Sequence, residues 1–219
     1  MKELNDISKD GLFKELYFPT TVFSVSCSGY KQLNSQLLSL IYAERERDQQ
    51  GIQRSNFREL GGWHSHNNLH QINAYNPLTE RVLQAGKRMS SQLGYHPSKE
   101  LKIGTMWSII NAPGSSNKSH IHPDCHWSGV YYVQVPDSGG DIEFTDPRTS
   151  HIMNQPSFDP KSKRSKDNWT KVRFTPKAGT MIIFPSWLYH SVEPNMSNKT
   201  GKEGERVIIS FNIPQVSGR

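Results

Sequence analysis

RVIISFNI, residues 206–213, is a short run of β-branched and aromatic side chains, and similar runs recur through the second half of the chain. Glycine, proline, asparagine and aspartate separate these runs and favour turns between strands. The runs lie at residues 101–111, 130–135, 141–145, 171–175, 180–184 and 206–213. A series of short strands joined by turns is typical of a β-sandwich or a β-barrel. The sequence therefore predicts a mainly β fold for this half.

The first hundred residues have a different pattern, with apolar side chains at helical spacing. One helix is predicted between Gly29 and about Gln50. A second is predicted to have Asn76 as its cap and Pro77 at its first position, and to end at Gly94. Its apolar stripe consists of Leu78, Val82, Ala85, Met89 and Leu93. In a chain of 219 residues we expect one domain, 1–219, with a helical N-terminal part over 1–100 and a β core over 101–214.

The composition argues against a membrane protein and against a disulfide-rich secreted one. Only 34% of the residues are apolar, and no uninterrupted apolar run approaches the roughly 20 residues that span a bilayer. Residues 1–6 lack the apolar core of a signal peptide, and the two cysteines, Cys27 and Cys125, do not make a disulfide framework. We therefore expect a cytoplasmic protein.

The net charge of +6 is concentrated in the basic stretch 161–171. This stretch is polar and rich in turn-forming residues, so we interpret it as a solvated, mobile loop. Its single aromatic residue, Trp169, does not provide a stacking surface for bases. Nucleic acid is therefore not the expected partner.

A small set of metal-binding side chains occurs in a fixed order along the chain. His122 and Asp124 lie two residues apart, and His190 follows much later. In an extended segment, residues i and i+2 point to the same side, so His122 and Asp124 are placed to bind one ion. Two histidines and a carboxylate form the triad typical of mononuclear iron(II) sites. The same spacing joins His120 to His122, so a site made of three histidines is equally compatible with the pattern.

Several segments together resemble the 2-oxoglutarate/Fe(II)-dependent dioxygenases. They are SGVYYV at 128–133, GGDIEF at 139–144, PKAGTMIIFP at 176–185 and RVIISFN at 206–212. The chain is most similar to an uncharacterised group of 2-oxoglutarate/Fe(II) oxygenases of bacteria and their phages. The similarity extends toward the N-terminus through RSN at 54–56 and GGWHS at 61–65, and so covers most of the chain.

The resemblance implies a double-stranded β-helix, also called a jelly roll, with the N-terminal helices packed on one sheet. It implies Fe(II) and 2-oxoglutarate as cofactors, and hydroxylation of a substrate with release of succinate and CO2. His122, Asp124 and His190 would hold the iron, and Arg206 would pair with the C5 carboxylate of 2-oxoglutarate, because a guanidinium matches a carboxylate with two parallel hydrogen bonds. The resemblance also suggests supporting polar contacts from Tyr131 or Tyr132, Ser210 and Asn111.

The chain departs from the pattern of related families at three positions. In the similar group the position of Asp124 is not reliably acidic, whereas histidines at the positions of His120 and His122 recur. Alignment with prolyl hydroxylases makes His120-Ile121-His122 the counterpart of their His-x-Asp motif. Ile208 stands where several families have a serine two residues after the arginine. Asn212 stands where nucleic-acid demethylases have a second arginine, which argues against base repair.

A group of three histidines and one tryptophan are also interpreted as parts of the pocket. His64, His66 and His70 have no cysteine or carboxylate among them, so we assign their segment to substrate binding or pocket closure instead of a second metal site. Trp187, which precedes His190, is predicted to form a packed wall of the pocket.

Alternatives to a hydroxylase remain on sequence grounds. One is a cupin-like metal-binding module without 2-oxoglutarate turnover. Another is an isomerase or a 2-oxoglutarate-independent oxygenase that uses three histidines. The substrate class is open between a protein, a nucleotide and a small molecule, and a homodimer is a possible assembly.

Overall fold

The computed structural model describes residues 11, 13–52, 54 and 61–218, and its main feature is a pair of antiparallel sheets. The larger sheet has six strands in the order β1-β9-β6-β11-β4-β2. These strands span Phe23–Ser26 (β1), Gly62–His64 (β2), Thr105–Asn111 (β4), Trp127–Gln134 (β6), Thr180–Pro185 (β9) and Arg206–Ile213 (β11). The strand β11 pairs with β4 from Arg206 to Asn212 and, across one register shift, with β6 from Val207 to Ile213.

The smaller sheet has four strands in the order β5-β10-β7-β8. They span Asn117–His120 (β5), Ile142–Thr145 (β7), Lys171–Phe174 (β8) and His190–Val192 (β10). A separate two-stranded ribbon joins Lys99–Leu101 (β3) to Gln215–Ser217 (β12). The mainly β expectation is therefore confirmed, with two sheets that form the layers of a jelly roll.

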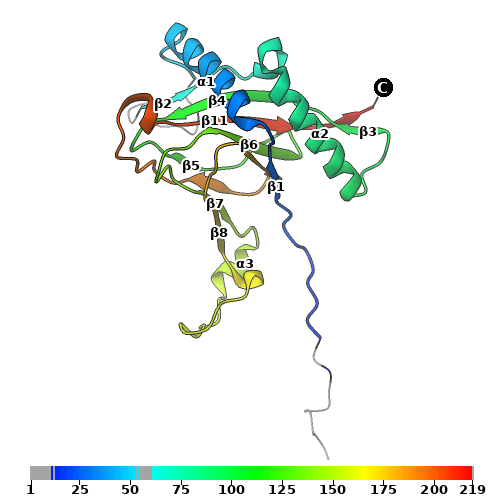
Figure 1. Cartoon of the computed structure of the whole chain (residues 1–219). Helices are drawn as coiled ribbons and strands as arrows, with labels where there is room; N and C mark the ends of the chain where they lie inside the picture. The colour runs from blue at the N-terminus through cyan, green and yellow to red at the C-terminus, as the bar shows by residue number, and fades with distance from the viewer. Residues whose placement is uncertain (1–10, 12, 53, 55–60, 219) are drawn as a thin grey trace, which may run out of the picture.

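Two long helices cover one face of the larger sheet, as Figure 1 shows above β4, β11 and β6. They span Tyr30–Arg47 (α1) and Asn76–Gln92 (α2), and a short helix spans Thr149–Met153 (α3). Single 3₁₀ turns occur at Leu69–Gln71 (η3), Asn73–Tyr75 (η4), Lys166–Asn168 (η5) and Gly201–Gly204 (η6). Figure 1 also shows that the helices lie on the side of this sheet away from β5, β7 and β8.

Side chains alternate across the larger sheet and build two separate cores. On β11, Val207, Ile209 and Phe211 pack in the core shared with the helices. Ile208, on the opposite face, packs in a second core between the two sheets. This separation follows from the two-residue period of a strand, which sends successive side chains to opposite faces. The second core leaves room for the cavity described below.

A buried polar contact fixes α1 on the sheet. The Asn34 side chain donates a 2.6 Å hydrogen bond to the Val133 carbonyl, and the Tyr131 hydroxyl donates a 2.6 Å hydrogen bond to Asn34 Oδ1. Buried polar groups lose their contacts with water, so these paired bonds offset that cost and set the position of the helix.

All six predicted strand segments contain strands, but the N-terminal hundred residues are not purely helical. They also contribute β1 and β2, which pair with β9 and β4. Asn76 is the first residue of α2 and not its cap, because the turn η4 runs directly into the helix and Tyr75 precedes it as the flanking residue. Gly94 follows the helix with φ of 66°, a left-handed conformation suited to a helix end.

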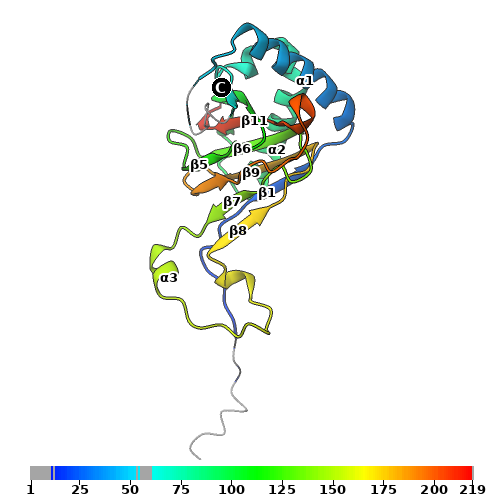
Figure 2. The ribbon, with the colours of Figure 1, turned by 90° about the vertical axis from the view of Figure 1, so that its left-hand side faces the viewer.

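An extension between β7 and β8 projects away from the two sheets in both Figure 1 and Figure 2. It includes α3 and the basic stretch 161–171, whose residues up to 167 are largely exposed. Lys171 is the first residue of β8 and forms a 2.6 Å ion pair with Glu143 on β7. The solvated character predicted for the stretch agrees with this exposure.

No helix in the described residues combines the length and the apolar character needed to cross a membrane. Residues 1–6, on which the expectation of no signal peptide rests, lie outside the described part of the chain.

Gly179 lies in the turn before β9, directly against the start of α1, and provides a test of the packing between that helix and the larger sheet. Its φ is 80°, and a Cβ at this position would overlap the ring of Tyr30 at the start of α1. Gly94 has a similar φ of 66° but has no atom near its Cβ position. We predict that Gly94→Ala lowers the free energy of unfolding by about 1–2 kcal/mol through left-handed strain alone. Gly179→Ala should cost about 1–3 kcal/mol more through overpacking.

Urea unfolding of both variants, followed by circular dichroism, measures the two losses. Equal losses would contradict the close packing of Tyr30 against this turn.

Candidate metal centre and its cavity

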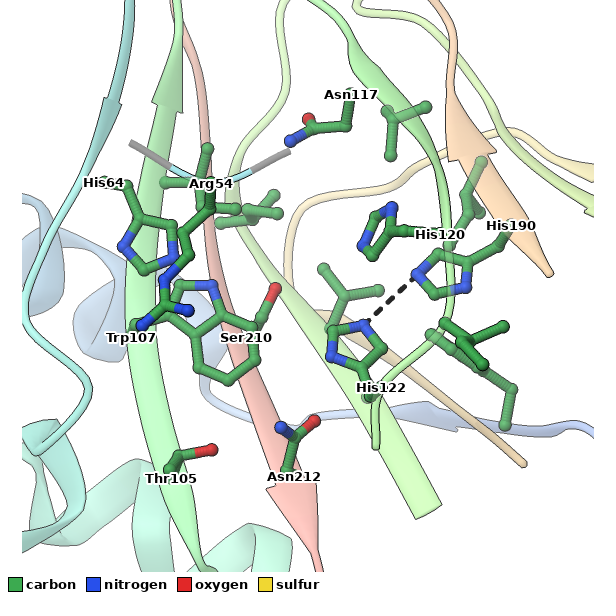
Figure 3. A pocket seen from close by; sticks show the side chains of 18 of the residues that line it. Arg54, His64, Thr105, Trp107, Asn117, His120, His122, His190, Ser210 and Asn212 are labelled. Atoms are coloured by element: carbon green, nitrogen blue, oxygen red, sulfur yellow. Dashed lines mark hydrogen bonds between the residues drawn. The ribbon is translucent and has the colours of Figure 1, made fainter. Parts of the chain in front are cut away.

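Three histidines converge at one end of the smaller sheet, as Figure 3 shows. His120, His122 and His190 each offer a ring nitrogen, and these ligand atoms all lie within 4.8 Å of one another. The ring centroids of His120 and His190 are 4.3 Å apart, and those of His122 and His190 are 5.2 Å apart. Such a group of imidazoles is a suitable site for a transition metal such as iron.

Strand pairing brings these residues together from distant parts of the chain. His120, the last residue of β5, pairs directly with His190, the first residue of β10. His122 follows two residues after His120, and its backbone N–H donates a 2.9 Å hydrogen bond to the Ser186 carbonyl. This bond holds the segment after β5 beside the turn that precedes β10, so His120 and His122 face the same side.

Hydrogen bonds to the backbone set the tautomer of two of the imidazoles, and His190 Nε2 also lies 3.3 Å from His122 Nε2, the contact drawn as a dashed line in Figure 3. His190 Nδ1 lies 2.9 Å from the Leu188 carbonyl oxygen, and His120 Nδ1 lies 2.6 Å from that of Lys118. A carbonyl can only accept, so each Nδ1 carries the hydrogen and each Nε2 is an unprotonated donor for a metal. Histidine ligands in metal sites are commonly oriented by such bonds.

Burial keeps the three imidazoles in the neutral form that binds metals. Loss of water lowers the pKa of His190 to about 3 and that of His122 to about 4, and the neighbouring imidazole of His120 adds to both effects, since two positive charges so close together would repel each other. Burial also lowers the pKa of His120. At neutral pH none of the three rings therefore carries a positive charge that a metal would have to displace.

Asp124 does not join this group in the structure. It is exposed, and its φ of 62° places it in a left-handed turn directly after His122. Because the chain is no longer extended there, the alternation that brings residues i and i+2 to one side ends at His122. The structure thus brings together the three-histidine set and leaves the carboxylate outside it.

The histidines line a cavity of about 480 Å³ between the two sheets. Its floor consists of alternate residues of β11 and β4, which are cross-strand neighbours. Arg206 lies at one end, Ile208 and Ile109 follow in the middle, and Ser210, Trp107, Asn212 and Thr105 continue the floor toward the other end. The floor therefore has polar ends with an apolar band between them.

Arg206 is a buried cation that faces the cavity, with 1% of its surface exposed. It donates to the carbonyls of Gly139, Gly140 and Glu193, and its Nη2 lies 2.5 Å from the oxygen of the Asn111 amide in the orientation that satisfies both groups. Burial lowers its pKa to about 10, and no carboxylate in the described chain offsets that effect. A guanidinium held only by neutral groups beside a cavity is suited to bind an anion.

The two candidate tyrosines face opposite sides of β6. Tyr132 is 3% exposed and lines the cavity, whereas Tyr131 points into the helix-side core and bonds to Asn34. Alternation along the strand therefore separates them, and Tyr132 is the tyrosine near Arg206. Ser210 lines the cavity, and Asn111 contacts the guanidinium instead of lining the cavity.

His64 is the member of the second histidine group that reaches the cavity. It is buried, and its ring stacks on that of Trp107 with centroids 5.6 Å apart. Burial lowers its pKa to about 4. Trp107, which sequence reasoning did not single out, lies on the cavity face of β4 with Thr105. The segment from Thr105 to Asn111 reads TMWSIIN and does not alternate between polar and apolar residues, so it carried no signal for the face that lines the cavity.

Trp187 is not a wall of the cavity, contrary to the sequence-based expectation. It is 52% exposed, and the neighbouring Leu188 is 2% exposed. The turn after β9, in which the Leu188 N–H bonds to the Pro185 carbonyl, directs Leu188 inward and leaves Trp187 at the surface.

Comparisons with known proteins relate the chain to one family of enzymes. Residues 105–212 match the model of a family described as "Putative 2OG-Fe(II) oxygenase". No curated protein sequence matches the chain.

Similar solved structures include a Pseudomonas putida prolyl-4-hydroxylase, with a TM-score of 0.58, 13% identity and coverage of 98% of this chain and 96% of that one. The epimerase SnoN from nogalamycin biosynthesis, in complex with Fe3+, alpha ketoglutarate and nogalamycin RO, has a TM-score of 0.60, 12% identity and coverage of 91% and 82%. A Trichoplax adhaerens prolyl hydroxylase in complex with a hypoxia inducible factor peptide fragment has a TM-score of 0.57, 13% identity and coverage of 88% and 82%.

At these identities the likeness establishes the fold, and it confirms the double-stranded β-helix. The family match spans every strand of the core from β4 to β11, together with the three histidines and the buried arginine. Residues 105–212 of this chain are therefore similar to the 2OG-Fe(II) oxygenase family over the part that carries the candidate site.

Proposed function

We propose that this chain is a single-domain, iron(II)- and 2-oxoglutarate-dependent hydroxylase whose metal is held by His120, His122 and His190. The observation that carries the proposal is one cavity that contains both a cluster of neutral imidazoles and a buried guanidinium with no carboxylate partner among the described residues. The first feature suits a metal cation, and the second suits a small anion. Together they match the cofactor pair of the family.

The donor set fits iron(II). Imidazole nitrogens are suitable ligands for iron, and two of the three rings are already oriented by bonds to backbone carbonyls. When bound, iron(II) would supply the redox chemistry by which dioxygen oxidises both partners: one oxygen atom enters succinate as 2-oxoglutarate loses CO2, and the other converts the C–H bond of the substrate to C–OH.

The remaining polar residues at this end of the cavity bind and orient the co-substrate. Arg206 holds the C5 carboxylate, and Asn111 keeps the guanidinium in place through its amide oxygen. Tyr132 contributes a phenol hydroxyl from the neighbouring strand β6. The apolar residues in the middle of the floor, Ile208 and Ile109, exclude water from the space between this end and the substrate.

Hydroxylation is the reaction proposed, because two of the similar structures are prolyl hydroxylases. SnoN is an epimerase with the same fold, so the outcome depends on how the substrate lies against the metal. Formation of a product 16 mass units heavier than the substrate, matched by succinate, distinguishes hydroxylation from epimerisation.

The proposed ligand set predicts a specific pattern of metal-binding losses. His120→Ala, His122→Ala and His190→Ala should each weaken Fe(II) binding by more than about 100-fold, beyond the loss typical for an outer hydrogen-bond partner. Asp124→Ala is the matched control and should leave the affinity unchanged, because Asp124 lies outside the cluster. Anaerobic titration calorimetry measures these affinities. Loss of binding in Asp124→Ala together with normal binding in His120→Ala would contradict this ligand set and favour His122, Asp124 and His190 instead.

Arg206 provides the test of the co-substrate. Anaerobic addition of 2-oxoglutarate to the Fe(II) protein should produce the visible charge-transfer band of a chelated keto acid. Arg206→Met should raise the Kd for 2-oxoglutarate by about 10- to 100-fold, as expected when a buried charged hydrogen bond is lost. Arg88→Met, on the exposed side of α2, makes the same chemical change away from the cavity and should have no effect. A wild-type protein that binds iron but shows no band would favour the cupin-like binding module.

Tyr131 and Tyr132 form a matched pair of hydroxyl deletions on adjacent residues. Tyr132→Phe should raise the Kd for 2-oxoglutarate by about 2- to 10-fold and change stability little. Tyr131→Phe should leave this Kd unchanged but lower the free energy of unfolding by about 1 kcal/mol, because it removes the bond to Asn34. The same spectroscopic titration and thermal unfolding separate the two effects. The reverse pattern would contradict the assignment of faces on β6.

A further inference from the structure

The cavity is longer than the co-substrate it is proposed to hold. Its floor on β11 runs from Arg206 to Asn212, which places the two backbone positions roughly 20 Å apart at the usual rise of a strand. A five-carbon diacid anchored at Arg206 cannot reach the far end. The far end therefore offers its polar groups to a different ligand, and in the proposed function that ligand is the substrate to be oxidised.

Two hydrogen-bonding atoms at this far end have no partner in the described protein. They are Trp107 Nε1 and Thr105 Oγ1, both shielded from solvent on the cavity face of β4. The side chain of Trp107 is only 8% exposed. Buried donors are nearly always paired in native proteins, since an unpaired one costs about 1–3 kcal/mol. An indole N–H can only donate, so its missing partner must be an acceptor.

The neighbouring groups also present donors. Asn212, the cross-strand neighbour of Thr105, accepts a 2.9 Å hydrogen bond from Ser128 at its side-chain oxygen, which leaves its NH2 group for the cavity. Arg54 lines the same region, and its charge contributes to the low pKa of His64. Figure 3 shows Arg54, His64 and Trp107 on one side of the cavity and the metal-binding histidines on the other.

The charges of the lining residues favour an anion. Arg54, Lys118 and Arg206 are cationic, and none of the described residues that line the cavity is an aspartate or a glutamate. His64 is neutral, and its ring, stacked at 9° to that of Trp107, fixes the plane of the indole. The described lining of the far end thus combines a positive charge with directed N–H donors and contains no carboxylate side chain.

We propose that this far end is a substrate subsite that binds an oxyanion, a carboxylate or a phosphate group, through Arg54 and Trp107, with Thr105 and Asn212 as additional donors. This inference rests on the proposed function, because it takes the Arg206 end to be filled by 2-oxoglutarate. The substrate is then an acidic molecule whose anionic group lies against β4. A C–H bond of the same molecule lies toward His122, whose ring centroid is 5.8 Å from that of Trp107.

Sulfate is a suitable probe for this subsite, and dimethyl sulfone is its neutral counterpart of similar shape. The full-length protein is loaded with Zn(II) and saturating 2-oxoglutarate, so that the metal is diamagnetic and Arg206 is occupied. Each probe is titrated at constant ionic strength, and the indole N–H signal of Trp107, identified by its loss in Trp107→Phe, is followed by ¹H–¹⁵N NMR. We expect sulfate to shift this signal saturably and the sulfone to leave it in place.

Substitution of the cation tests its role directly. Arg54→Gln should weaken sulfate binding by about tenfold or more, as loss of a charged hydrogen bond does. Arg88→Gln, on the exposed face of α2, is the matched control and should bind sulfate like the wild type. No saturable shift with sulfate, an equal shift with the sulfone, or unchanged binding in Arg54→Gln would each overturn the subsite.

The charge-transfer band of the Fe(II) protein with 2-oxoglutarate separates this inference from the proposed function. A normal band without a sulfate response overturns the subsite and leaves the oxygenase assignment intact. A sulfate response without the band contradicts the oxygenase assignment, and with it the role of the subsite in binding a substrate to be oxidised.

Discussion

The alternation of side chains along β11 is the constraint on which the rest of the molecule depends. One set of residues, including Val207 and Phe211, is buried against the helices, and the other set, including Arg206 and Ser210, faces the cavity. A shift of the strand by a single residue would exchange the two sets and place the guanidinium in the helix-side core. The register with β4 and β6 therefore fixes both the stability of the larger sheet and the position of the anion-binding end.

The sequence predicted the long strands well because each of them carries enough β-branched and aromatic residues to give a local signal. It gave no such signal for β5 and β10, which span only Asn117–His120 and His190–Val192 and hold metal-binding histidines. Their strand character comes from pairing between distant segments, which no local pattern records.

The prediction for Asp124 failed for a related reason. Two residues that are two positions apart share a face only while the chain stays extended, and the chain turns directly after His122. The sequence did not show whether Tyr131 or Tyr132 would face the co-substrate. The two-residue period of β6 places them on opposite faces, and the structure shows which face lines the cavity.

The absence of carboxylates from the described lining has a consequence for the charge of the metal site. Three neutral imidazoles leave the full double charge of an iron(II) ion unbalanced, whereas a carboxylate ligand would cancel part of it. Burial of net charge is costly, so a site of this kind gains from a dianionic ligand. 2-Oxoglutarate is such a ligand, and in the proposed site Arg206 would offset the charge of its distal carboxylate. The three-histidine set and the buried guanidinium are therefore electrostatically consistent with each other as parts of one co-substrate site.

The same reasoning explains why the unpaired donors lie where they do. Of the unpaired buried side-chain atoms in the described residues, Trp107 Nε1 and Thr105 Oγ1 are the two that belong to residues lining the cavity, whereas Ser108 Oγ, also on β4, is unpaired but does not line it. Donors left unpaired in a free protein reject ligands that lack an acceptor, because such ligands bury them without compensation. Selectivity for an acidic substrate would then arise less from the exposed charge of Arg54, which water screens, than from the shielded indole and hydroxyl beside it. In this view the stacking of His64 on Trp107 is a specificity device, since it holds the indole N–H in a fixed direction opposite the metal-binding histidines.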